Sequence, residues 1–184
     1  AFEKFLNEFP TSPYAEKVSS YLVEVYMNTR SYDAALKSID RIAKPSAQIL
    51  EAKQKILFQL GTQSFANADF EQALKYLNQS IAIGQYNRQT KADAYYWCGE
   101  SYYRLNRMVE AARDFNAYLQ LTTQPNNEMY ALANYNLGYI AFHRKDYTQA
   151  SNYFQKYIQL EKGENTTALA DAYNRIGDCH LHVR

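Results

Sequence analysis

The chain has 184 residues and a formal net charge of +1, since 20 Lys and Arg nearly balance 19 Asp and Glu. This balance argues against a nucleic-acid partner or an anionic membrane surface, because both attract proteins with a strong basic field. No apolar stretch is long enough to span a bilayer, so we expect no membrane insertion by this segment. No signal peptide is recognisable, which leaves the compartment unknown.

Apolar spacing and capping residues predict ten helical segments in chain order. Residues 1–9 form the first, and Ser12 is the expected N-cap of the second, with Pro13 in its first turn. The later segments are expected at 31–43, 46–65, 69–83, 90–105, 107–121, 127–143, 146–161 and from 166 onward. We expect a single array in which these helices pair as residues 12–44, 46–84, 88–122 and 127–162. Residues 1–10 would then end a preceding pair, and residues 166–184 would begin a fifth.

Four glycines recur at steps of 38, 39 and 39 residues and mark an internal repeat: Gly61, Gly99, Gly138 and Gly177. Twelve residues after each of the first three stands an alanine, and four residues later a large apolar residue: Ala73 and Leu77, Ala111 and Phe115, Ala150 and Phe154. An earlier copy has Val23 in place of the glycine, followed by Ala35 and Ile39. A fixed period of this size is typical of stacked helical hairpins. We expect each glycine to face the alanine of its partner helix, with the large residue beside the next hairpin.

The best copy of this pattern resembles the tetratricopeptide repeat (TPR) signature, as Tyr95-x2-Cys98-Gly99-x2-Tyr102 followed by Ala111-x3-Phe115. The resemblance covers essentially the whole chain. It implies an all-α, right-handed TPR superhelix, an α-solenoid of antiparallel helix pairs A and B. About four full repeats, with partial repeats at both ends, would fill the chain.

The repeat is longer than the family period of about 34 residues, and the extra residues all lie between the alanine and the next glycine. This long repeat, with the phrase Phe2-x2-Phe5-Leu6-x2-Phe9-Pro10, is similar to bacterial cell-envelope TPR proteins. Those include the outer-membrane-assembly lipoprotein and the Tol–Pal accessory protein. The similarity suggests the periplasm or cell envelope, with the cytoplasm as the alternative. Neither end has a polar capping helix, so we expect a piece of a longer array whose exposed stack ends allow a homodimer.

The resemblance further implies that the A helices line a concave, peptide-binding groove. Family groove positions relative to each glycine carry over to these residues: Tyr96, Glu100, Tyr103, Arg104, Tyr135, Tyr139 and Phe142. Such an aromatic strip suits an extended or helical peptide with apolar anchors. The alternative is that the rings only pack between A helices. Positions one after each glycine equivalent hold no Asn and three acidic residues, which argues against a carboxylate clamp and favours a basic or neutral ligand.

Catalysis has little support, since there are three His, no phosphate-binding loop and no G-x-S-x-G motif. Cys179 and His182 could share a helix face, but a zinc site needs about three or four ligands. We therefore expect no catalytic residues, no metal and no cofactor. The predicted function is a non-catalytic protein–protein interaction scaffold that binds a peptide or protein segment. The alternatives are a recognition arm of a longer multidomain envelope-assembly protein or enzyme, and a purely structural spacer.

Overall fold

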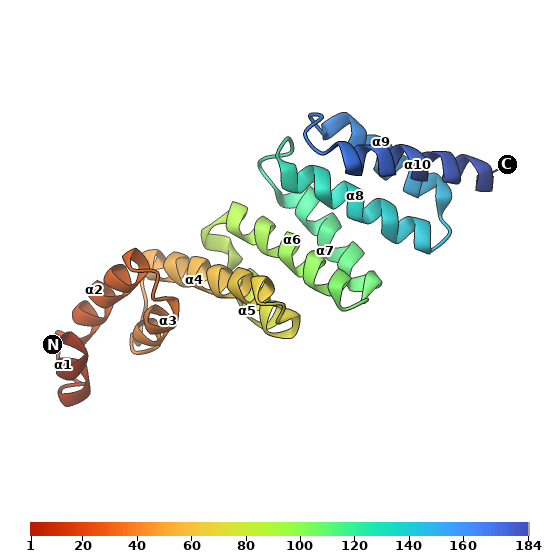
Figure 1. Cartoon of the computed structure of the whole chain (residues 1–184). Helices are drawn as coiled ribbons and strands as arrows, with labels where there is room; N and C mark the ends of the chain where they lie inside the picture. Colours follow the sequence, from red (N-terminus) through yellow and green to blue (C-terminus); the bar gives the residue numbers. More distant parts are fainter. Residues whose placement is uncertain (184) are drawn as a thin grey trace. The chain divides into compact units, whose positions relative to one another are not determined.

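The computed structural model describes residues 1–183, and over these residues the chain is all-helical (Figure 1). The elements are α1 (Phe2–Glu8), α2 (Ala15–Asn28), α3 (Tyr32–Asp40), α4 (Ala47–Ala66), α5 (Phe70–Ala82), the 3₁₀ turn η1 (Gly84–Tyr86), α6 (Arg88–Arg104), α7 (Met108–Leu121), α8 (Glu128–His143), α9 (Tyr147–Leu160) and α10 (Thr166–Val183). The expected all-α fold of helix pairs is confirmed. The chain forms two compact units, Ala1–Trp97 and Cys98–Arg184, and the division falls within α6.

Side-chain caps explain where several helices begin. Ser46, Asp69, Asn127 and Asp146 each accept a hydrogen bond from the backbone N–H three residues later. The expected cap at Ser12 is wrong, because α2 begins at Ala15 and Tyr14 is its N-cap residue. The Ser12 hydroxyl instead accepts the Tyr14 N–H at 3.2 Å, which places Pro13 in the turn before the helix.

The first four A helices are α2, α4, α6 and α8. Each is followed by a residue in the left-handed conformation that is not glycine. The residues, with φ between 57° and 63°, are Arg30, Ala68, Asn106 and Lys145. In each case the next N–H bonds to a carbonyl five residues earlier, as in Asp69 to Ser64 and Asp146 to Ala141, both within 3.0 Å. This bond closes the helix end and turns the chain directly into the B helix.

The first unit packs α2 against α3 and α4 against α5. Val23, Ala35, Ile39, Ile56 and Leu60 form a buried cluster that joins the two hairpins. Two hydrogen bonds of Gln54 fix α4 relative to its neighbours. The Gln54 side-chain amide donates to the Asn87 backbone carbonyl at 2.8 Å, and the Ser80 hydroxyl donates to the Gln54 backbone carbonyl at 2.8 Å. The first bond links α4 to the segment after α5, and the second links α5 to α4, so both satisfy backbone carbonyls between packed elements.

The second unit packs α8 against α9 and α9 against α10. Its core contains Ala150, Phe154 and Tyr157 of α9, together with Ala172 and Cys179 of α10. Cys98 and Cys179 are both free and buried.

Three of the repeated glycines lie closest to the large residue of the B helix. A Cβ added to Gly99 would lie 2.8 Å from the Phe115 ring, and one added to Gly138 would lie 2.8 Å from the Phe154 ring. Gly61, Gly99 and Gly138 therefore lie closest to the large residue of their own B helix, and at Gly61 the backbone carbonyl of the expected alanine, Ala73, also lies 3.4 Å from the added Cβ. The missing side chain provides the space in which the ring packs.

Among residues 1–183, no helix combines the length and the apolar character that a membrane-spanning segment needs.

Candidate functional site

Six of the seven predicted site residues lie in the second unit, on α6 and α8: Glu100, Tyr103, Arg104, Tyr135, Tyr139 and Phe142. The seventh, Tyr96, belongs to the first unit and is 3% exposed. Its ring packs edge-on against Trp97, with the centroids 5.2 Å apart. Tyr96 therefore offers little surface for a ligand.

Tyr135 and Tyr139 join the packing of their own repeat to the next A helix. Their rings lie 5.2 Å apart and pack edge-on against Phe154, at 5.9 Å and 5.2 Å. Both hydroxyls donate to the same carboxylate oxygen of Asp171 on α10, at 2.6 Å from Tyr135. The two side chains are half-buried, so they pack inside the chain and remain partly accessible.

Asp171 is the electrostatic centre of this cluster. Burial by itself would raise its pKa, but the hydrogen bonds from Tyr135 and Tyr139 and the charge of Arg175 outweigh burial and lower the pKa below its ordinary 3.8. Arg175 Nε lies 3.6 Å from Asp171, and its Nη1 lies 2.9 Å from Asp178. Burial, followed by the hydrogen bond with Asp171, raises the pKa of both tyrosines, so both phenols remain donors at neutral pH.

A second link connects the neighbouring A helices α6 and α8. The Asn136 side chain donates to the Glu100 carboxylate at 2.7 Å. Tyr103 is half-buried and burial raises its pKa, whereas Arg104, the last residue of α6, is exposed. The A-helix face of the second unit is thus held by side-chain bonds from α6 to α8 and from α8 to α10.

Phe142 lies at the far end of this face, where α8 meets α9. Its ring packs edge-on against Tyr147 at 5.4 Å, and the Arg175 guanidinium lies 5.8 Å from its centroid. The geometry therefore brings Tyr135, Tyr139 and Phe142 together with α10. We refer to these three residues with Glu100, Asn136, Asp171, Arg175 and Asp178 as the A-helix patch.

Profiles of the tetratricopeptide repeat match residues 58–128 and residues 131–163, which together are more than half of the chain. The chain belongs to the TPR family. No curated protein matches the sequence. Among solved structures, the TPR chain is similar to MamA at a TM-score of 0.59 and 18% identity, covering 93% of this chain and 84% of that one.

Two other structures show the same fold likeness. YrrB, described as a TPR protein with an unusual peptide-binding site, has a TM-score of 0.59 and 16% identity over 99% of this chain and 83% of that one. BtubC from P. vanneervenii has a TM-score of 0.62 and 13% identity over 99% of this chain and 80% of that one.

The TPR signature identified the contribution of α6 and α8 to the patch, but Asp171 and Arg175 of α10 were not among the predicted site residues. Asp178 was considered only as one of the acidic residues that follow a glycine equivalent. The spacing of these three residues could have predicted that they lie together, because acidic and basic residues three and four apart share one helix face.

Cys179 and His182, considered as half of a metal site, do not lie in a position to bind one metal ion together. Cys179 is buried, and the His182 ring stacks on Tyr147 with centroids 4.3 Å apart.

The patch contains phenols, carboxylates, an amide and a guanidinium, which are groups suited to binding. Within residues 1–183, no group of three or more His, Cys, Asp and Glu side chains could hold a metal ion.

A separate groove of about 460 Å³ lies in the first unit, between the A helices α2 and α4, where Tyr21, Glu24 and Met27 face Ile49. The A-helix side of each unit thus presents mixed aromatic and acidic side chains.

We expect Asp171→Asn to lower the free energy of unfolding by about 1 kcal/mol at neutral pH, because the charge-assisted bonds from Tyr135 and Tyr139 weaken. The folded-state pKa of Asp171 is lowered, so its stabilisation is present above the ordinary pKa of 3.8 and is lost as the pH falls through the folded-state pKa. Denaturant unfolding of both proteins at neutral and strongly acidic pH measures this. A difference that stays constant across that range would contradict the prediction.

Proposed function

We propose that this TPR chain is a non-catalytic protein–protein interaction scaffold whose A-helix patch binds a peptide or protein segment. The observation that carries the proposal is the fixed geometry of the patch. Tyr135 and Tyr139 share the Asp171 carboxylate, and Asn136 holds Glu100. Side chains already ordered in the free protein lose less conformational entropy when a ligand binds.

The chemistry of the patch favours a neutral or basic segment with apolar anchors. The phenolic hydroxyls of Tyr135 and Tyr139 are bonded to Asp171, so the half-buried rings of Tyr139 and Phe142 provide the apolar contact. Glu100 and Asp178 add carboxylates one residue after the repeat glycines Gly99 and Gly177. A cation of the ligand near these carboxylates would gain attraction. YrrB, which has a peptide-binding site of its own, gives the proposal a precedent on the same fold.

A finer proposal concerns the setting in which the scaffold works. The repeat period of 38 or 39 residues supports the likeness to long-repeat TPR proteins of the bacterial cell envelope. On this proposal the chain recruits a client or subunit as the recognition arm of a longer assembly protein, and the cytoplasm is the alternative compartment. Fractionation of the source cells with an antibody to this chain tests the setting independently of the patch.

Selection from a peptide display library, followed by calorimetric titration of the selected peptides, tests the scaffold proposal. We expect Phe142→Leu to weaken binding about tenfold, because it removes a ring of the patch and keeps most of its volume. Glu100→Gln retains an oxygen for Asn136 but loses the charge, so binding of a basic peptide should weaken by about fivefold. Glu71→Gln, an exposed position on the B helix α5, is the matched control.

Each variant must keep the unfolding temperature of the parent for its affinity to count. Selected peptides that bind equally well to Phe142→Leu, Glu100→Gln and Glu71→Gln would overturn the patch as the binding site. A library that yields no specific peptide would favour the structural-spacer alternative.

A further inference from the structure

In the second unit, side-chain bonds join each A helix to the next one. The Asn136 side chain on α8 donates to Glu100 on α6. The Tyr139 hydroxyl on α8 donates to Asp171 on α10. In the first unit, a groove of about 460 Å³ lies between the A helices α2 and α4 instead. Both walls of this groove belong to complete helix pairs, because α2 packs against α3 and α4 packs against α5.

One position of the repeat is small on α2 and aromatic on the later A helices. Val23 is the glycine equivalent of α2, and Ser20 stands three residues before it. Three residues before the glycines of α4, α6 and α8 stand aromatic rings: Phe58, Tyr96 and Tyr135. On α8 this ring packs against Tyr157 of α9, with the centroids 4.9 Å apart, and its hydroxyl donates to Asp171 of the next A helix. On α2 the same position lines the groove, which has room for a ring because about 150 Å³ is enough for benzene.

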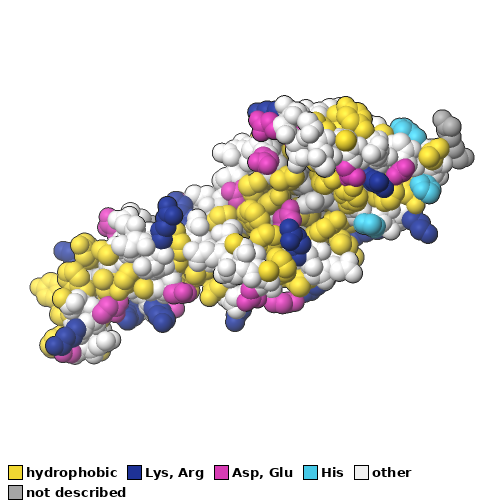
Figure 2. Space-filling model, viewed as in Figure 1, with side chains coloured by type: hydrophobic (Ala, Val, Ile, Leu, Met, Phe, Trp, Pro, Cys, Tyr) yellow, Lys and Arg dark blue, Asp and Glu magenta, His cyan; other side chains and the backbone are white. Residues whose placement is uncertain are grey.

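The floor of the groove is apolar, and its edge carries amides. Met27, Ile49 and Ala52 are half-buried and pack against the buried cluster that joins the two hairpins. Figure 2 shows hydrophobic side chains at the surface of the first unit, interspersed with acidic and basic ones. Asn28 and Gln48 are exposed at the groove, and their carboxamides can donate to and accept from the backbone of a peptide. The groove therefore suits a peptide with an apolar anchor.

Glu24 gives the groove its charge. Of the described residues that line the groove, Glu24 alone is charged. Its side chain is exposed, and no hydrogen bond or ion pair within residues 1–183 joins its carboxylate to another group. At the equivalent position of α6, by contrast, Glu100 is held by Asn136. An unpaired carboxylate beside an apolar floor attracts a cation of the ligand and repels an anion.

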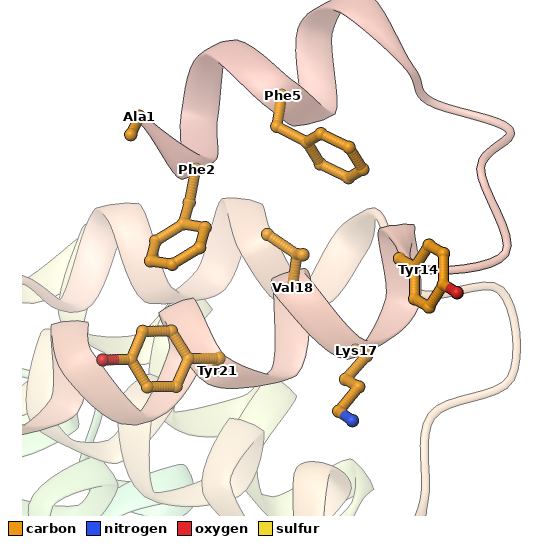
Figure 3. Close-up of a pocket in the computed structure, with 7 residues that line it drawn as sticks. All are labelled: Ala1, Phe2, Phe5, Tyr14, Lys17, Val18 and Tyr21. Atoms are coloured by element: carbon orange, nitrogen blue, oxygen red, sulfur yellow. The ribbon is translucent and has the colours of Figure 1, made fainter.

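Tyr21 also lines a second groove, of about 670 Å³, between α1 and α2. Figure 3 shows that groove, in which the Tyr21 ring packs edge-on against Phe2 with the centroids 5.3 Å apart. Lys17 lines the α1–α2 groove, whereas Glu24 lines the α2–α4 groove. The charge of a ligand therefore distinguishes the two.

We propose that the α2–α4 groove binds a segment of a partner protein in which an aromatic residue and a Lys or Arg stand two positions apart. The aromatic ring occupies the space beside Ser20, and the cation meets Glu24. These two residues are one turn apart on one face of α2, with their Cβ atoms about 5–6 Å apart. In an extended segment, alternate side chains point to the same side and are about 7 Å apart. The A-helix patch lies in the second unit, so each site can bind without the other.

Selection from a peptide display library on the 184-residue chain tests this proposal. Prior passage over the Ser20→Tyr chain removes the peptides that bind elsewhere. We expect the selected peptides to share an aromatic residue and a Lys or Arg two positions apart. Ser20→Tyr fills the groove with the residue that α6 and α8 carry at this position. It should therefore weaken binding at least about tenfold without lowering the unfolding temperature.

Charge reversal tests the role of Glu24 by calorimetric titration of the selected peptides. Glu24→Lys should weaken binding by about fivefold. A peptide with Glu in place of its basic residue should bind the Glu24→Lys chain more tightly than it binds the parent chain. Glu16→Lys, at an exposed position of α2 outside the groove, is the matched control. It should leave the affinity unchanged, as should Phe142→Leu in the A-helix patch.

Peptides that bind Ser20→Tyr and Glu24→Lys as tightly as the parent chain would overturn the proposal, and so would a selection that lacks the expected pair of residues. Peptides that are lost with Phe142→Leu alone would belong to the A-helix patch, which would support the proposed function and remove this site. Sedimentation velocity covers the remaining occupant. A parent chain that self-associates when Ser20→Tyr does not would assign the groove to a second copy and overturn the partner segment.

Discussion

Replacing Phe154 with alanine will lower the free energy of unfolding of the second unit by about 3–5 kcal/mol. The ring is fully buried and packs edge-on against Tyr135 and Tyr139, at 5.9 Å and 5.2 Å. It also fills the space that Gly138 leaves open. The flanking helix backbones hold the walls of the cavity apart, so only part of the lost contact can be recovered by collapse. Urea unfolding followed by circular dichroism measures the loss.

The matched control is Val109→Ala on α7, where the side chain is 71% exposed. We expect it to change the free energy of unfolding by less than about 0.5 kcal/mol. Phe154→Ala should also weaken peptide binding, because Tyr135 and Tyr139 lose the ring that positions them. Similar small losses for both variants would show that Phe154 is not the packing centre of its repeat.

The helices and their pairing were predictable because the repeat imposes them. Gly99 and Phe115, like Gly138 and Phe154, recur in fixed register, and their packing depends on that register alone. The sequence did not reveal which residue faces the glycine, because alanine and phenylalanine four apart lie on the same helix face. The close approach of the Phe154 ring to the Gly138 backbone depends on how tightly the two helices pack, which the repeat does not specify.

The helix ends were less predictable for a physical reason. Arg30, Ala68 and Lys145 adopt a left-handed conformation that glycine or asparagine usually occupies. Packing of the A helix against its B helix enforces the turn, so the residue type at this position does not predict where the helix ends. The predicted N-cap at Ser12 was wrong because its hydroxyl accepts a hydrogen bond from the Tyr14 N–H. Helix α2 begins only at Ala15.

The candidate site was predictable as a face, without its bonds. The repeat register placed Tyr135, Tyr139 and Phe142 on one side of α8. The shared bond to Asp171 depends on how closely α8 and α10 approach, which periodicity does not report. The register also predicted too much. Tyr96 lies three residues before a repeat glycine, as Tyr135 does, but it is only 3% exposed.

Gly138→Ala and Gly177→Ala will change stability in opposite directions, although both replace a repeat glycine in an A helix. Alanine favours a helix over glycine by up to about 1 kcal/mol. At Gly138 the new Cβ would lie 2.8 Å from the Phe154 ring, whose buried position leaves it little room to move. Overpacking of this kind costs about 1–3 kcal/mol, so after the helix gain we expect a net loss of up to about 2 kcal/mol.

At Gly177 nothing lies within 4 Å of the added Cβ, so only the helix preference remains and we expect a gain of up to about 1 kcal/mol. Parallel urea unfolding of the two variants and the parent measures both signs. A gain at both positions would mean that the Phe154 ring moves aside freely and that the glycine is not required there. A loss at both would contradict the prediction, because it would mean that the added Cβ at Gly177 has no room in solution.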